Sequence, residues 1–294
     1  MSIAKVGVVG AGVIGRGVAQ SLAQTGHEVV LIDRTDAILT SAVSDVANGL
    51  RFAAFSDPTL RKADHAEILS RIRVSTHYQD LADVDFVVEN VTEDWSIKET
   101  VYEALDRTCP PLCVFAANTS AIRIGRLGAV TRRRASVIGM HFMNPVPQKQ
   151  YVEVIVGSHT SDAAVASAKT LLDQLGKKAI LVRDNPGFVS NRVMMLMINE
   201  AIAVLEEGVA SASDVDSIFV NCFSHKMGPL ATADLIGLDT ILRTLDVLRD
   251  ELQNKKFEAT PLLRLMVEQG RVGRKSGSGF FEYGARIEGK IHGD

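Results

Sequence analysis

A glycine-rich turn between an apolar strand and an amphipathic helix is the feature that most constrains how this chain folds. The apolar residues 3–9 lead into Gly10, where the sequence G-A-G-V-I-G begins, and it ends at Gly15. An amphipathic segment then extends to Gly26, and a second apolar run, residues 29–32, follows it. Strand, glycine turn, helix and strand in this order predict a βαβ unit at the start of a parallel sheet.

The spacing of the three glycines matches a turn that binds a dinucleotide. Gly10 permits the tight bend, Gly12 lets the backbone approach a pyrophosphate, and Gly15 lets the helix pack closely on the strand. Val13 and Ile14 form the first turn of the helix, whose N-terminus attracts phosphate charge. We therefore expect residues 10–15 to hold the phosphates of a nicotinamide or flavin dinucleotide.

An acidic residue follows the second strand, at the place where such units bind a ribose. Asp33 lies 18 residues after Gly15, and a carboxylate there accepts hydrogen bonds from the ribose hydroxyls. It also repels a 2′-phosphate, which favours NAD over NADP. Arg34 keeps NADP as an alternative, because an arginine at this place can bind a 2′-phosphate.

The rest of the first two thirds of the chain alternates between strand and helix patterns. Apolar, β-rich runs recur at residues 72–74, 85–88, 113–116, 136–139, 151–156 and 178–182. Helical patterns separate most of them: a pair within residues 36–71, broken at Asp57-Pro58, and single helices over 95–107 and 162–174. Strands that alternate with helices predict a mainly parallel sheet covered on both faces.

The pattern changes at Asp184-Asn185-Pro186-Gly187, after which the chain is helical throughout. We expect helices over residues 188–207, 213–221, 231–254 and 260–268. The predicted fold class is thus α/β, with a Rossmann-type NAD-binding domain, residues 1–184, followed by an all-helical substrate and dimerisation domain, residues 185–294. The 188–207 helix has few polar positions, so we expect it to be buried on most of its circumference and to contribute to a homodimer.

Composition and charge exclude several classes of protein. With 46% hydrophobic and 23% charged residues the chain is typical of globular proteins, and a net charge of −3 gives no electrostatic footprint for nucleic acid or an anionic membrane. No apolar stretch reaches the length of about 18 residues that a membrane span needs. The three cysteines, Cys109, Cys113 and Cys222, form neither a disulfide framework nor a zinc set. We expect a cytoplasmic protein with reduced cysteines.

Candidate catalytic residues follow the later predicted strands, where ligands bind in open α/β sheets. Asn118 and Ser120 come after the strand at 113–116, and His141 follows the strand at 136–139. All three are expected to face the nicotinamide end of the cofactor. Oxidation of an alcohol needs a base near neutral pH, and a histidine supplies one when a carboxylate such as Glu153 orients it. Taken alone, a buried histidine is more often structural than catalytic.

A set of motifs in a fixed order makes the chain resemble the 3-hydroxyacyl-CoA dehydrogenase family over essentially its whole length. The matching segments are Gly10–Gly15, Glu89–Glu93 with Lys98, Asn118–Ser120, Gly139–Pro147, Val152–Val154, Pro186–Arg192, Met227–Pro229, Asp234–Asp239 and Gly273–Gly277. Together they are far more specific than the glycine turn, and they favour His141 as a catalytic residue.

The resemblance implies a role for each matched residue. It makes His141 the general base with Glu153 as its partner, and Ser120 and Asn191 the residues that hold the substrate oxygens. It makes Glu93 and Lys98 contacts of the cofactor, and it places Asn144 in the same cleft. Other interpretations remain open at this stage: Glu93 as a charge at a helix start, Lys98 as a solvated surface charge and Ser120 as a turn or cap residue.

The implied activity is the NAD-dependent, metal-free interconversion of a 3-hydroxyacyl thioester and its 3-oxoacyl thioester, in fatty acid metabolism and on CoA. Three departures from the family pattern concern substrate recognition: Gln148–Tyr151, Lys226 and the few basic residues within 49–66. They leave open an alternative in which the hydroxyacyl group, such as a glyceryl unit, is carried by an acyl carrier protein. A non-catalytic NAD(H) sensor is a further alternative, although it has no use for the four catalytic residues.

Overall fold

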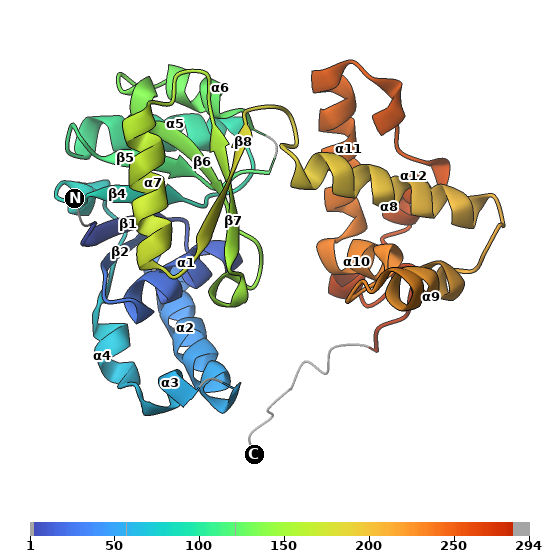
Figure 1. The fold of residues 1–294 in the computed structure, drawn as a ribbon, viewed down its shortest axis with the longest axis horizontal. Coiled ribbons are helices and arrows are strands. Elements are labelled where there is room, and N and C mark those ends of the chain that lie inside the picture. The colour runs from blue at the N-terminus through green and yellow to red at the C-terminus, as the bar shows by residue number, and fades with distance from the viewer. Residues whose placement is uncertain (1–2, 57, 121, 285–294) are drawn as a thin grey trace. The chain divides into compact units, whose positions relative to one another are not determined.

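The chain consists of two compact units, Met1–Phe188 and Val189–Asp294. The computed structural model describes residues 3–56, 58–120 and 122–284 (Figure 1). The first unit is a sheet with helices on both faces and the second is helical, so the predicted fold class is confirmed. The predicted boundary between residues 184 and 185 falls just after the last strand. That cofactor binding belongs to the residues before it, and substrate binding and dimerisation to those after it, stays a prediction.

The sheet of the first unit has eight strands in the order β3-β2-β1-β4-β5-β6-β7-β8. The strands are β1 Lys5–Val9, β2 Glu28–Ile32, β3 Ile72–Ser75, β4 Phe86–Glu89, β5 Val114–Ala117, β6 Val137–His141, β7 Tyr151–Val156 and β8 Lys178–Arg183. Neighbouring strands are parallel except β6 and β7, which run antiparallel. The predicted mainly parallel sheet is confirmed, and its direction reverses beside His141.

Helices cover both faces of this sheet, as the patterns predict (Figure 1). They are α1 Val13–Gln24, α2 Asp36–Ser56, α3 Pro58–Lys62, α4 His65–Ser70, α5 Trp95–Thr108, α6 Ile124–Ala129 and α7 Asp162–Gln174. One core joins α1, α2 and α7 to the sheet through residues such as Leu22, Leu39 and Leu171. The other joins α5 and α6 to the opposite face through Leu105 and Leu127.

The second unit contains α8 Ser190–Glu206, α9 Ala212–Phe223, α10 Pro229–Ile236, α11 Leu238–Leu252 and α12 Pro261–Glu268. The prediction of a single helix over residues 231–254 is wrong, because two helices, α10 and α11, occupy this part of the chain. Gly237 interrupts it with φ of 103°, a conformation outside the helical region that glycine adopts without steric cost. The apolar pattern continues across this break, so periodicity alone does not reveal it.

The predicted burial of helix α8 on most of its circumference is met in part. Its buried residues, Met195, Ile198, Ala201 and Ile202, fall on one side of the helix, and most of its other residues are half-buried. Val193 is 62% exposed.

A buried aspartate on α10 attaches the last described segment of the chain. Asp234 accepts hydrogen bonds from the backbone N–H groups of Phe280 and Phe281, at 3.0 and 2.9 Å, and from the Tyr283 hydroxyl at 3.1 Å. A Cβ at Gly279 would lie 2.0 Å from this carboxylate, so the close approach requires glycine. These contacts give the Asp234–Asp239 motif a structural role.

Within the residues that the structure describes, no helix is both long enough and apolar enough to cross a membrane.

Candidate active site and cofactor cavity

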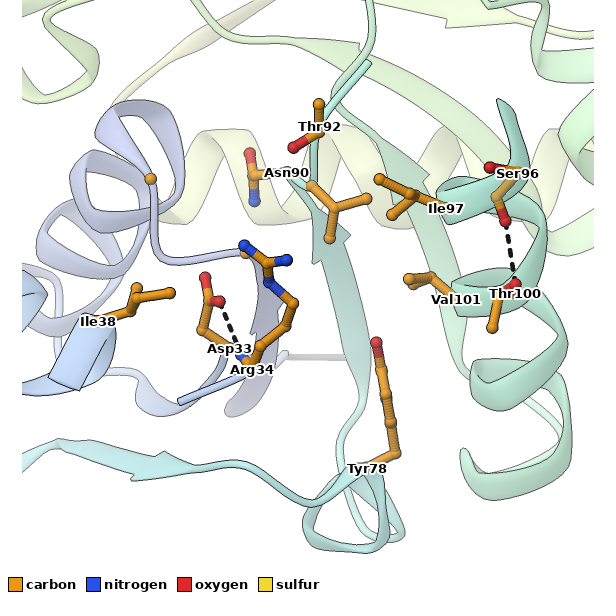
Figure 2. Close-up of a pocket in the computed structure, with 13 residues that line it drawn as sticks. Asp33, Arg34, Ile38, Tyr78, Asn90, Thr92, Ser96, Ile97, Thr100 and Val101 are labelled. Atoms are coloured by element: carbon orange, nitrogen blue, oxygen red, sulfur yellow. Dashed lines mark hydrogen bonds between the residues drawn. The ribbon is translucent and has the colours of Figure 1, made fainter. Parts of the chain in front are cut away.

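A cavity of about 620 Å³ lies at the carboxyl ends of β1, β2 and β4, bordered by the glycine turn (Figure 2). Its volume is within the usual range of small-molecule sites, roughly 300–1,000 Å³. Gly10, Gly12 and Asp33 line it on one side, and Ile97 and Val101 of α5 line it on another. The structure thus brings the predicted phosphate turn and the predicted ribose-binding acid to one cavity.

The glycine turn leaves space where a pyrophosphate would approach. A Cβ at Gly15 would lie 1.8 Å from the Gly10 carbonyl oxygen, so helix α1 and the turn pack in direct backbone contact. At Gly12, by contrast, an added Cβ meets no described atom within 4 Å. Helix α1 begins at Val13, followed by Ile14, and its N-terminus favours phosphate charge.

The carboxylate of Asp33 is held in place by the backbone. It accepts a hydrogen bond from the Ala11 N–H at 2.7 Å and one from the Arg34 N–H at 2.6 Å. The Arg34 and Tyr78 side chains also line the cavity, as Figure 2 shows. Burial, together with the nearby carboxylates of Glu89 and Asp33, raises the pKa of Tyr78.

Asn90 lines the cavity, and its side-chain amide donates to the Val88 carbonyl at 3.0 Å. The predicted ribose-binding acid and the open glycine turn together fit NAD.

The antiparallel step in the sheet places His141 directly opposite Glu153. The two residues are register partners on β6 and β7, and directly opposed residues in such a pair point to the same face. The His141 Nδ1 lies 3.0 Å from a Glu153 carboxylate oxygen, and both side chains are buried. The carboxylate therefore orients the imidazole and fixes which ring nitrogen carries the proton.

Ser120 meets the other side of the same imidazole. Its hydroxyl oxygen lies 3.2 Å from His141 Nε2. Ser120, His141 and Glu153 thus form a continuous hydrogen-bonded line at the carboxyl edge of β5 and β6. A serine that served only as a turn or cap residue would have no such contact.

Glu93 organises the loop that carries Ser120. One of its carboxylate oxygens accepts hydrogen bonds from the Thr119 hydroxyl and from the backbone N–H groups of Ser120 and Ile122. Helix α5 begins two residues later, and Asp94 is its N-cap. Glu93 is thus more than a charge that favours a helix start.

Lys98 is fully buried, so the interpretation of this residue as a solvated surface charge is wrong. Its ammonium group donates to both carboxylate oxygens of Glu89, at 2.7 and 2.9 Å, and to the Asn118 carbonyl at 3.3 Å. It lies 4.0 Å from the nearest Glu93 carboxylate oxygen. Burial raises the pKa of Glu89, and Lys98 opposes that shift.

Sequence reasoning assigned no role to Glu89, although a signal was present. An acid ends the otherwise apolar run of β4, nine residues before a lysine, and a charge at the end of a buried strand needs a partner. Through Lys98 this pair reaches Asn118, whose side-chain oxygen accepts the Phe142 N–H at 3.0 Å. The ends of β4, β5 and β6 are therefore linked.

Two predicted site residues remain, Asn144 in the first unit and Asn191 in the second. Asn144 borders a smaller cavity of about 150 Å³ together with Val13. The segment that follows Asn144 is held by the buried Lys177. Its ammonium group donates to the carbonyls of Val146 and Lys149, at 2.8 and 2.7 Å. Burial lowers the pKa of Lys177. Asn191 belongs to α8 of the second unit, so its part in the site stays a prediction.

In the described part of the chain, no group of three or more His, Cys, Asp or Glu side chains is arranged to hold a metal ion.

Both halves of the chain match models of one enzyme family. Residues 5–185 match the NAD binding domain of 3-hydroxyacyl-CoA dehydrogenase, and residues 187–283 match its C-terminal domain. The chain belongs to the 3-hydroxyacyl-CoA dehydrogenase family. It is an NAD-dependent enzyme, so the predicted family, cofactor and reaction class are confirmed.

Individual relatives cover almost the whole chain. It is 43% identical to a probable 3-hydroxybutyryl-CoA dehydrogenase of Deinococcus radiodurans over 279 residues, which is 95% of this chain and 100% of the relative. It is 39% identical to a 3-hydroxybutyryl-CoA dehydrogenase of Clostridioides difficile, covering 95% and 99% of the two chains. A crystal structure of (S)-3-hydroxybutyryl-CoA dehydrogenase from Ralstonia eutropha superposes with a TM-score of 0.91 at 42% identity, covering 96% and 99%.

Removal of the buried lysine should destabilise the first unit. Lys98→Met leaves the Glu89 carboxylate buried without its cation, which should lower the free energy of unfolding in urea by about 3–5 kcal/mol. The double variant Glu89→Leu/Lys98→Met removes both charges and should regain much of that loss. A single variant as stable as the wild type would show that the pair contributes little.

Replacement of the ribose-binding acid should weaken cofactor binding. Asp33→Ala should raise the NADH dissociation constant about 10- to 100-fold, the effect of losing a charge-assisted hydrogen bond, and relax discrimination against NADPH. Fluorescence titration with both cofactors measures this, with Asp36→Ala, an exposed acid on α2, as the control. If the wild type already binds NADPH more tightly, Arg34 governs the choice instead.

Proposed function

We propose that this enzyme oxidises short 3-hydroxyacyl-CoA thioesters of the 3-hydroxybutyryl-CoA type with NAD⁺, and that it reduces the 3-oxoacyl thioester in the reverse direction. The observation that carries the proposal is the line from Ser120 through His141 to Glu153. This line lies at the carboxyl edge of the sheet that also bears the cofactor cavity.

The proposed mechanism assigns one task to each residue of this line. Bound NAD⁺ supplies the hydride acceptor. A substrate hydroxyl within reach of both Ser120 and His141 Nε2 gives its proton to the imidazole. Glu153 keeps the proton on Nδ1 beforehand and stabilises the imidazolium afterwards. In the reverse direction, His141 returns the proton to the carbonyl oxygen, which Ser120 polarises by hydrogen bonding.

The remaining predicted residues complete the proposed site. Glu93 and Asn118 shape the nicotinamide side, and Lys98 supports both from its buried position. Asn144 borders the smaller cavity beside helix α1. Asn191 would add an amide group from the helical domain to the substrate site. In this proposal residues 1–184 bind the cofactor, and residues 185–294 complete the substrate site and form the dimer.

The named relatives favour CoA over a carrier protein. The names of these relatives specify hydroxybutyryl-CoA. The departures at Gln148–Tyr151 and Lys226 do not belong to the hydrogen-bonded line. A non-catalytic sensor would have no reason to keep a serine, a histidine and a glutamate in this geometry.

Replacement of the base tests the proposed function. His141→Gln should lower the rate of acetoacetyl-CoA reduction, followed by NADH absorbance, about 10²- to 10⁴-fold. NADH affinity should change little, because His141 does not line the cofactor cavity. His159→Gln, which changes an exposed histidine, is the control. Turnover close to that of the wild type in His141→Gln would exclude this histidine as the base.

We further propose that the enzyme is a homodimer formed through its helical domain. That domain has several exposed large apolar side chains on α9, α10 and α12: Ile218, Val220, Phe223, Leu235, Ile236 and Leu265. Soluble monomers rarely expose this much apolar surface, and a symmetric pairing would bury it against its own copy.

Light scattering at micromolar concentration tests the dimer. We expect twice the chain mass of 31.8 kDa, and Phe223→Asp should shift the mass toward one chain, since a buried unpaired charge opposes association. Asp250→Asn, an exposed position on α11, should not. A wild-type mass of 31.8 kDa would contradict the dimer.

We also propose a cytoplasmic location. Cys109 and Cys113 are free and buried, which suits a reducing compartment.

A further inference from the structure

Phe188 has a backbone conformation that is unusual for a bulky residue. Its φ is 51°, in the left-handed region, where an aromatic side chain is strained. Two other non-glycine residues with positive φ, Ser224 and Gln253, are polar and end helices. Phe188 is instead 3% exposed and belongs to a hydrophobic core of the first unit.

The strained turn directs the phenyl ring toward the imidazole of His141. Gly187 also has positive φ, 71°, and the Phe188 N–H donates to the Asn185 carbonyl at 2.8 Å. The two consecutive residues with positive φ thus form a tight turn after β8. The rings of Phe188 and His141 then meet with centroids 6.0 Å apart and planes inclined by 63°, an edge-to-face arrangement.

The hydrogen bonds to Ser120 and Glu153 hold the two ring nitrogens of His141. The Phe188 ring adds an aromatic contact to the imidazole, and this contact limits how far the imidazole can tilt. Strained residues tend to occur where geometry matters for function.

We propose that Phe188 is a positioning residue for the reaction: its ring sets the tilt of His141, so that Nε2 faces the substrate hydroxyl. The inference rests on the proposed role of His141 as the base. The strained backbone at 187–188 is the means by which the Pro186–Arg192 motif brings this ring to the imidazole.

The test compares Phe188→Leu with Phe115→Leu. Phe115 lies in the same core and is fully buried, and its ring packs edge-to-face on Tyr102 rather than on His141. Each variant is assayed for urea unfolding, NADH affinity, the KM for acetoacetyl-CoA and kcat. We expect both to lose stability, but only Phe188→Leu should lose kcat, about 10- to 100-fold, with KM and NADH affinity changed less than about twofold. Its deuterium isotope effect with 4-deuterated NADH should rise, because hydride transfer becomes slower.

Other results would overturn the proposal. Phe188→Leu with wild-type kcat, or equal kcat losses in both variants, would make Phe188 a core residue only. Phe188→Asn keeps a residue that tolerates the left-handed region but removes the ring, so normal kcat in this variant would also overturn it. Failure of the proposed function is separately visible, because it would appear as turnover in His141→Gln.

Discussion

The buried ion pair between Lys98 and Glu89 is the interaction on which the functional edge of the sheet depends. Both charges are out of contact with water, which is costly unless each is well paired. Glu89 lies on β4 and Lys98 on α5, and Lys98 also donates to the carbonyl of Asn118, which follows β5. The Asn118 side chain extends the linkage to Phe142 after β6. The cavity wall and the hydrogen-bonded line of Ser120, His141 and Glu153 are therefore parts of one connected structure.

The reversal of strand direction between β6 and β7 provides the second constraint. In a wholly parallel sheet, the start of the strand after His141 would lie at the opposite edge from the site. Because β7 runs the other way, Glu153 meets His141 as a direct cross-strand partner. The chemistry thus uses the sheet register itself, and a shift of one residue would turn the acid to the other face.

Much of this arrangement could be predicted from sequence because it depends on local patterns. Glycine spacing, the acid at Asp33 and the alternation of strand and helix each reflect a geometric requirement that fixes residue types at set distances along the chain. The break at Gly237 could not be predicted in this way, since the apolar pattern continues across it. The contact of Lys98 with the Asn118 carbonyl and the ring contact of Phe188 could not be predicted either, because they join residues brought close only by tertiary packing.

His141 and Glu153 lie on hydrogen-bonded strands of an eight-stranded sheet rather than on loops. Such strands open only when most of their domain opens. Heat therefore cannot separate His141 from Glu153 while the sheet is intact, and this contact should endure until the domain itself melts. Ser120, on a loop held by Glu93, has no comparable protection, so thermal loss of activity should begin on its side of the imidazole.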